Sequence, residues 1–199
     1  MNTKQIFMTV LITGTTVVYG VAQETGAINV DSAATANAAA NADMNGSAMA
    51  ENTVDSKTQE FADEAATGGM MEVALGNMAQ EKANSSAVKE FALQMVTDHT
   101  QAGDELKALA QEKSIVLPGS MTDKQQRSVD KLSELSGDEF DKEYMKMMVK
   151  DHEKDVKTYE KASENVTDTE LQDFAAKTLP TLKEHLQHAK DVNDQMRSS

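Results

Sequence analysis

Apolar residues recur every three to four positions from about Lys57 to Met196, a spacing typical of amphipathic α-helices. Breaks in this pattern place helices at about 57–83, 85–113, 122–135, 137–163 and 167–196. Four of these helices are long and one is short, which predicts an all-α fold, a four-helix bundle with a short connector helix. The segment 114–136 is long enough to carry the chain along the bundle, which would allow a ferritin-like crossover, and an up-down-up-down order stays open.

Local signals mark several of the predicted helix ends. Ser85 is a cap candidate for the second helix, and Pro118 interrupts the pattern after that helix. The stretch TDTE, from Thr167 to Glu170, is typical of a capping box and predicts the start of the last helix. Pro180 lies inside the last helix, where its ring and missing N–H predict a kink.

The N-terminal part of the chain lacks the helical period. Residues 1–22 resemble a signal peptide, with an apolar run from Ile6 to Val21 that is short for a membrane span. An uncleaved membrane anchor is the less favoured interpretation. Residues 23–56 are rich in Ala, Asn, Ser, Gly and Asp, which predicts a disordered linker before a helical domain at 57–197. We therefore expect a periplasmic or secreted protein.

Composition narrows the partners that the protein could have. The net charge of −14 repels nucleic acid and anionic lipid, so we expect neither nucleic acid nor, once the signal is cleaved, a membrane as a partner. Aromatic residues make up only 4% of the chain whereas Met occurs 13 times, so the core must be built mainly from Leu, Val, Ala and Met. Because Cys is absent, packing, or packing plus a ligand, must hold the exported fold together.

A short stretch occurs twice in nearly the same form. KEFALQMVTDH (89–99) and KEYMKMMVKDH (142–152) agree at seven of eleven positions, counting Phe with Tyr, and both end on histidine. Duplication of a helical unit explains the similarity. It does not explain why a histidine lies on an apolar helix face in both copies.

Four polar residues share this unusual placement. Glu72, His99, His152 and His185 each lie on the apolar face and near the middle of a different long helix. The middle of one helix meets the middle of its neighbours whichever way each helix runs, so these side chains are expected to converge in one layer of the core.

Two kinds of chemistry would stabilise such a layer. Three His and one Glu suit a transition metal such as Zn²⁺, Fe²⁺ or Cu²⁺, and do not suit Ca²⁺ or Mg²⁺. The alternative is a structural layer in which the carboxylate accepts hydrogen bonds from the imidazoles. Asp98 and Asp151 precede two of the histidines, and we expect them either to orient a histidine of a neighbouring helix, to pair with Lys, or to face solvent. His188 is predicted to lie outside the layer.

These segments resemble the DUF4142 family of exported bacterial proteins. The residues that carry the resemblance are GGMMEVALG (68–76), the two MVxDH segments that end at His99 and His152, and LPTLKEHL (179–186). The resemblance covers about Phe61 to Val192 and implies a ferritin-like helical bundle. Because the family has no established biochemical function, the resemblance supports the fold and adds little about the role.

The residues do not favour an enzyme. Ferritin-like di-iron proteins carry Glu-x-x-His, but the residues three positions before the histidines are Val96, Val149 and Leu182, which argues against ferroxidase or oxygenase chemistry. No nucleophile–base pair or phosphate-binding loop is evident. A thioether copper site is a further alternative, although Met at helical spacing is more often core filler. The candidate residues for that site are Met70, Met71, Met145, Met147 and Met148.

Two functions therefore remain open from the sequence. The first is an exported bundle of uncharacterised role with one transition-metal ion in the Glu/His layer, for binding, sensing or storage. The second is a structural or stress-protective interaction protein in which the layer only fixes helix register.

Overall fold

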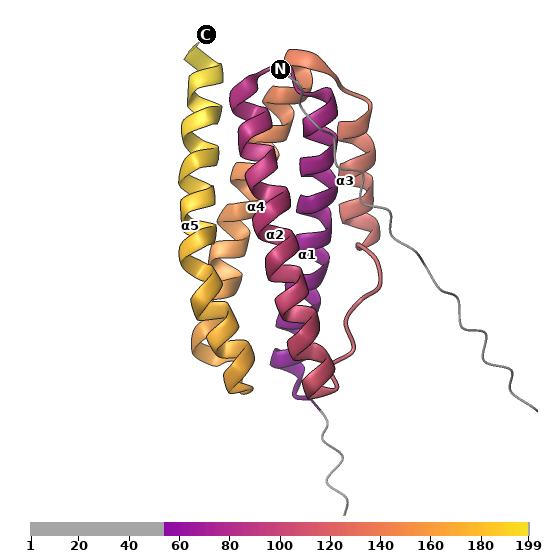
Figure 1. The fold of residues 1–199 in the computed structure, drawn as a ribbon, viewed down its shortest axis with the longest axis vertical. Coiled ribbons are helices and arrows are strands. Elements are labelled where there is room, and N and C mark those ends of the chain that lie inside the picture. The colour runs from indigo at the N-terminus through magenta and orange to yellow at the C-terminus, as the bar shows by residue number, and fades with distance from the viewer. Residues whose placement is uncertain (1–53, 199) are drawn as a thin grey trace, which may run out of the picture. The chain divides into compact units, whose positions relative to one another are not determined.

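A computed structural model describes residues 54–198 of the chain, and within them it contains five helices and no strand (Figure 1). The helices are α1 (Ser56–Lys82), α2 (Ser86–Lys113), α3 (Asp123–Ser133), α4 (Gly137–Asn165) and α5 (Thr169–Ser198). No end differs from the predicted helix ends by more than two residues. The predicted all-α bundle with one short connector helix is confirmed. The predicted signal peptide, 1–22, lies outside the described residues, as does nearly all of the predicted linker.

The four long helices form two antiparallel hairpins joined by a long crossover. Short loops join α1 to α2 and α4 to α5, so each of these pairs is a hairpin. The loop before α2 contacts the first turn of α4 through Asp141, so α2 and α4 begin at the same end of the bundle. The segment 114–136, which contains α3, therefore returns the chain along the length of the bundle (Figure 1). The sequence allowed this crossover and left an up-down-up-down order open.

Two apolar clusters fill the bundle, one toward each end. One contains Phe91 and Tyr144, and the other contains Phe61 and Phe174. Each long helix contributes to both clusters. On α2, α4 and α5 the predicted polar residue lies between the two contributions, and on α1 Glu72 lies directly after Met71, where the contribution to one cluster begins. Apolar packing on both sides therefore fixes the position of the polar layer along all four helices.

The methionines belong mainly to this apolar packing. Met71, Met145 and Met148 are buried members of one cluster, and Met147 packs against it. An unbranched thioether adapts to irregular gaps in a core, which explains their abundance without a ligand role. Their placement supports the core-filler interpretation over a thioether copper site.

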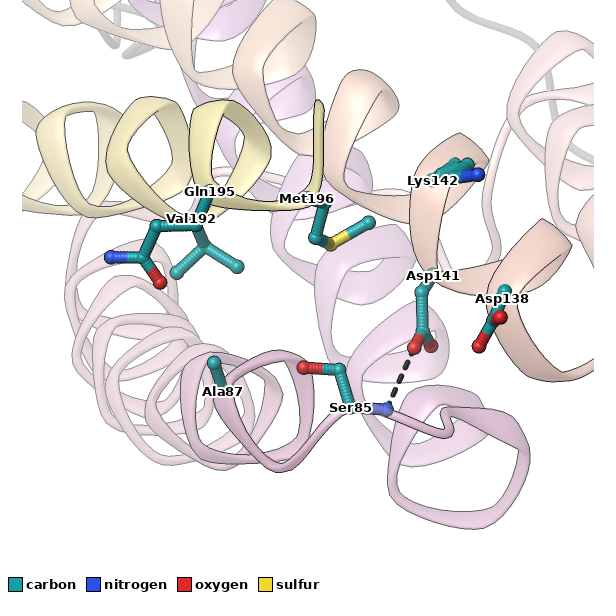
Figure 2. A pocket seen from close by; sticks show the side chains of 8 residues that line it. All are labelled: Ser85, Ala87, Asp138, Asp141, Lys142, Val192, Gln195 and Met196. Atoms are coloured by element: carbon teal, nitrogen blue, oxygen red, sulfur yellow. Dashed lines mark hydrogen bonds between the residues drawn. The ribbon is translucent and has the colours of Figure 1, made fainter. Parts of the chain in front are cut away.

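A carboxylate from α4 caps α2 (Figure 2). Ser85 precedes α2, as predicted, but its side chain makes no capping hydrogen bond. Instead, the buried Asp141 carboxylate accepts hydrogen bonds from the backbone N–H groups of Asn84, at 3.1 Å, and Ser85, at 2.7 Å. It thereby satisfies N–H groups at the α2 start that would otherwise lack partners.

The start of α5 corrects one prediction. The capping box from Thr167 to Glu170 is wrong, because the helix begins two residues later and Asp168 caps it. The Asp168 carboxylate accepts hydrogen bonds from the backbone N–H groups of Glu170 and Leu171, both at 3.1 Å. The Thr167 hydroxyl instead bonds to the Asp55 carboxylate at the start of α1. The helix then continues through Pro180.

The two residues directly before Ser56 contact the helical bundle. Asp55 caps α1 by accepting hydrogen bonds from the backbone N–H groups of Lys57 and Thr58, and Val54 packs against the core. The folded bundle therefore includes residues that the sequence pattern assigned to the linker. Among the described residues, no helix is long and apolar enough to cross a membrane.

Candidate metal centre

The four predicted residues meet in the middle of the bundle. Glu72 of α1, His99 of α2, His152 of α4 and His185 of α5 are 2%, 8%, 0% and 1% exposed. The centres of the three imidazole rings lie 5.4 to 5.6 Å from one another. The predicted convergence in one layer is therefore present, and each long helix supplies one member.

Each imidazole uses one ring nitrogen in a contact with an oxygen acceptor. His99 Nδ1 lies 2.9 Å from Glu72 Oε2, and His152 Nδ1 lies 2.9 Å from the backbone carbonyl of Met148. His185 Nε2 lies 2.8 Å from Asp98 Oδ2. Because a carbonyl or a carboxylate only accepts, each of these ring nitrogens donates its N–H. In a neutral imidazole the other nitrogen then carries a free lone pair.

The remaining polar atoms of the layer have no hydrogen-bond partner within the described structure. They are His99 Nε2, His152 Nε2, His185 Nδ1 and Glu72 Oε1. One ligand nitrogen from each of the three histidines lies within 4.8 Å of the others, and Glu72 Oε1 lies 3.5 Å from His152 Nε2. When Glu72 is ionised, the three histidines offer nitrogen lone pairs to a shared space with Glu72 Oε1 beside it, and no N–H or O–H of the layer satisfies these atoms. Buried polar atoms without partners are costly, so the arrangement calls for a positively charged or proton-donating occupant.

Burial keeps the imidazoles in the form that binds metals. It lowers the pKa of His99 from 6.5 to about 4 and also lowers the pKa values of His152 and His185. Burial also raises the pKa of Glu72 from 4.5 to about 7, against a smaller opposing effect of His152. Without a cation, a charged Glu72 is therefore disfavoured in this layer. A bound cation would reverse that preference, since a metal ligand must be deprotonated.

The two aspartates that precede the repeated histidines have different surroundings. Asp98 bonds to His185 of the neighbouring α5, which is the orienting contact that the sequence predicted as one alternative. Asp151 makes no hydrogen bond to a histidine in the described part of the chain, and its Oδ2 is buried without a partner. The orienting role is therefore wrong for Asp151.

His188 lies outside the layer, as predicted. Its Nδ1 lies 3.1 Å from Gln94 Oε1, and its ring packs edge-on against Phe91 with the centres 5.3 Å apart. It is half-buried and serves as an internal comparison for the three histidines of the layer.

Residues 43–192 match the family described as a domain of unknown function, DUF4142. The chain belongs to the DUF4142 family. The match contains all four residues of the layer and begins inside the segment that the sequence pattern assigned to a linker. No curated protein matches the chain.

Two solved structures have the same fold as this DUF4142 chain. A DUF305 fragment from Deinococcus radiodurans has a TM-score of 0.63 and 13% identity, over 71% of this chain and 98% of the fragment. A putative secreted DUF305 protein from Streptomyces coelicolor has a TM-score of 0.61 and 14% identity, over 71% of this chain and 94% of its own. At these identities the likeness concerns the fold alone.

Two further residues near the layer were not found from the DUF4142 sequence. Asp155 follows His152 by one turn of α4, and burial, followed by the charges of Glu72 and Asp151, raises its pKa to about 9. Tyr144 has a buried hydroxyl without a hydrogen-bond partner, and burial and Glu72 raise its pKa. Spacing from His152 is the only signal in the sequence for Asp155, and it resembles that of any polar residue on a helix flank.

Proposed function

We propose that this exported bundle binds one transition-metal ion through Glu72, His99, His152 and His185. The observation that carries the proposal is the cluster of three histidine ligand atoms within 4.8 Å of one another, beside the buried and unpartnered Glu72 Oε1. A hydrogen-bonded polar layer needs a proton on Glu72 to supply a donor, whereas a cation bound to the ionised Glu72 needs none.

The contacts around the layer support the same conclusion. A metal-binding histidine usually donates its other N–H to a carboxylate or a carbonyl, which fixes the ring orientation. The three histidines do so toward Glu72, Met148 and Asp98 respectively. Such contacts prepare the rings for a metal and do not, by themselves, require one.

The spacing of the ligand atoms defines how far the site must contract. Two nitrogens bound to one tetrahedral ion at about 2.0 to 2.1 Å lie about 3.4 Å apart. The histidine ligand atoms lie within 4.8 Å of one another. The rings therefore need to close by no more than roughly 1.4 Å, which side-chain rotation can provide.

The donor set limits the identity of the ion. Imidazole nitrogen and one carboxylate suit Zn²⁺, Fe²⁺ and Cu²⁺, whereas Ca²⁺ and Mg²⁺ prefer oxygen ligands. The site has one carboxylate, whereas a di-iron centre needs several. We therefore infer a role in binding, sensing or storing one ion in the periplasm or outside the cell. In the competing structural role, the same layer would fix helix register without any ion.

A titration with Co²⁺ tests the proposal, because Co²⁺ in a tetrahedral site of this kind absorbs visible light. We expect one equivalent of Co²⁺ to bind to the wild type and to His188→Ala, and none to bind tightly to His152→Ala. Circular dichroism checks that each variant remains helical. Equal binding by the two variants, or no binding by the wild-type protein, would contradict the proposal.

A further inference from the structure

A pocket of about 490 Å³ opens on one side of the bundle, beside the proposed site. Residues of α1, α3 and α4 line it, among them Gly68, Asp151 and Asp155. Its rim carries exposed charges of both signs, including Lys154, which lies 3.5 Å from Glu64. The rim carries four lysines, Lys124, Lys146, Lys150 and Lys154, against Glu64 and Glu143, so any attraction for a cation must come from the carboxyl groups beneath it.

Those inner groups are carboxylates. Asp151 and Asp155 are half-buried, and Asp151 Oδ2 is buried without a hydrogen-bond partner. They lie four residues apart on α4, so both face the same side of the helix. A carboxyl group that lines an open pocket and has an oxygen without a hydrogen-bond partner is a suitable contact for a cation.

Asp155 links this pocket to the proposed site. It lines the pocket, and its carboxyl group also lowers the pKa of Glu72. Glu72 is 2% exposed and has an unpartnered Oε1. Asp155 is thus in reach of solvent on one side and of the Glu72 carboxyl on the other.

Gly68 leaves the approach open. It lies one turn before Glu72 on the same side of α1. A Cβ placed at Gly68 would have no atom within 4 Å, so a side chain there would extend into open space beside the pocket. A larger residue at position 68 would therefore occupy the pocket without a clash with the backbone.

A second opening near the layer is less suited to a cation. It lies between α2 and α5, has a volume of about 120 Å³, and is lined by Asp98. The Asp98 carboxylate already accepts the N–H of His185. The opening beside α1 and α4 is larger and offers a carboxylate oxygen that has no partner.

We propose that the pocket lined by Gly68, Asp151 and Asp155 is the entrance through which a divalent transition-metal cation reaches Glu72 and the three histidines. Asp155 receives the ion from the pocket and transfers it to Glu72. This inference rests on the proposed metal site and adds the route and the residues that control loading.

The rate of Co²⁺ loading, measured by stopped-flow absorbance on the full chain, tests this route. Gly68→Leu is the blocking variant, and Gly103→Leu is its matched control, because Gly103 is also a helical glycine with no atom near an added Cβ. Asp155→Asn keeps the shape of the side chain and removes the carboxyl group that can ionise to bind a cation.

We expect Gly68→Leu to slow association and dissociation of Co²⁺ on the order of tenfold, since loading would then wait for local opening of the bundle. Its stoichiometry and Kd should equal those of the wild type, and Gly103→Leu should load at the wild-type rate. Asp155→Asn should slow association about tenfold, because the amide cannot lose a proton to become the carboxylate that takes up the ion.

The outcomes separate the route from the site. If Gly68→Leu binds one equivalent at the same rate as Gly103→Leu, the pocket is not the entrance and the metal site stands. If Gly68→Leu loses helical content, Asp155→Asn decides, and loading at the wild-type rate overturns the route. If the wild-type chain binds no Co²⁺, the proposed function fails and the route fails with it.

Discussion

Replacement of Glu72 by glutamine separates a metal site from a structural layer by the sign of its effect on stability. Glu72 is 2% exposed and contacts His99 at 2.9 Å. The Glu72→Gln change keeps the shape of the side chain and an oxygen acceptor for His99, and the new amide adds the N–H donor that the layer lacks. It also removes the charge that a cation would bind.

The magnitude follows from the pKa of the carboxyl. Burial raises the pKa of Glu72 from 4.5 to about 7. Because the pKa is higher in the folded state, the protonated Glu72 stabilises the fold relative to the ionised form. This stability is fully present below pH 4.5 and is lost as the pH rises to about 7. At about 1.4 kcal/mol per pKa unit, the ionised group costs the metal-free protein about 3 kcal/mol above this window. Glu72→Gln should therefore stabilise the metal-free protein by up to about 3 kcal/mol at pH 8, and by little at pH 4.

Addition of metal should reverse the order of stability. An ion at about 100 times its Kd stabilises the wild-type protein by about 2.7 kcal/mol, and the Glu72→Gln variant should bind the ion more weakly. Urea unfolding with chelator and with excess Zn²⁺ measures both states, with Glu143→Gln, an exposed carboxylate on α4, as the control. A Glu72→Gln protein that is less stable than the wild type at pH 8 without metal, and that Zn²⁺ stabilises as much as it does the wild type, would refute the reasoning.

Three other changes test separate parts of the structure. Gly76→Ala should destabilise the bundle by about 1 to 3 kcal/mol, because the new Cβ would lie 2.7 Å from a methyl group of α2. Gly103→Ala should leave the stability unchanged or raise it, and thermal unfolding distinguishes the two variants. Asp141→Ala should cost about 1 to 3 kcal/mol in urea unfolding, since two N–H groups at the α2 start lose their acceptor, and an unchanged midpoint would contradict that capping role. Asp98→Asn should weaken Co²⁺ binding about 10- to 100-fold through the histidine that it orients, and an unchanged Kd in calorimetry would contradict it.

The helices and the polar layer were predictable because they depend on local pattern. The period of apolar residues fixes the helices, and a histidine or glutamate near the middle of each apolar face fixes the layer along the bundle axis. The contacts within the layer were not predictable, since they depend on how each helix is rotated about its axis. Burial of Asp155 and capping of α2 by Asp141 follow from that rotation and from the crossover.

The two repeated segments show this limit most clearly. Asp98 and Asp151 occupy equivalent positions before His99 and His152. Asp98 meets a histidine of α5, whereas Asp151 faces the pocket beside α1 and α3. Equivalent residues therefore have different surroundings because the two helices have different neighbours. The sequence of either segment alone does not predict those neighbours.

The most direct test of the metal site is the metal content of the protein as it is isolated from cells. The chain is purified without a His tag or chelators, and its metals are counted by mass spectrometry beside His188→Ala and a triple His99/His152/His185→Ala variant. We predict about one equivalent of a transition metal in the wild type and in His188→Ala, and none in the triple variant. A wild-type protein without metal, which also shows no thermal shift with Zn²⁺, Cu²⁺ or Fe²⁺, would contradict the proposed site and leave the layer with a structural role.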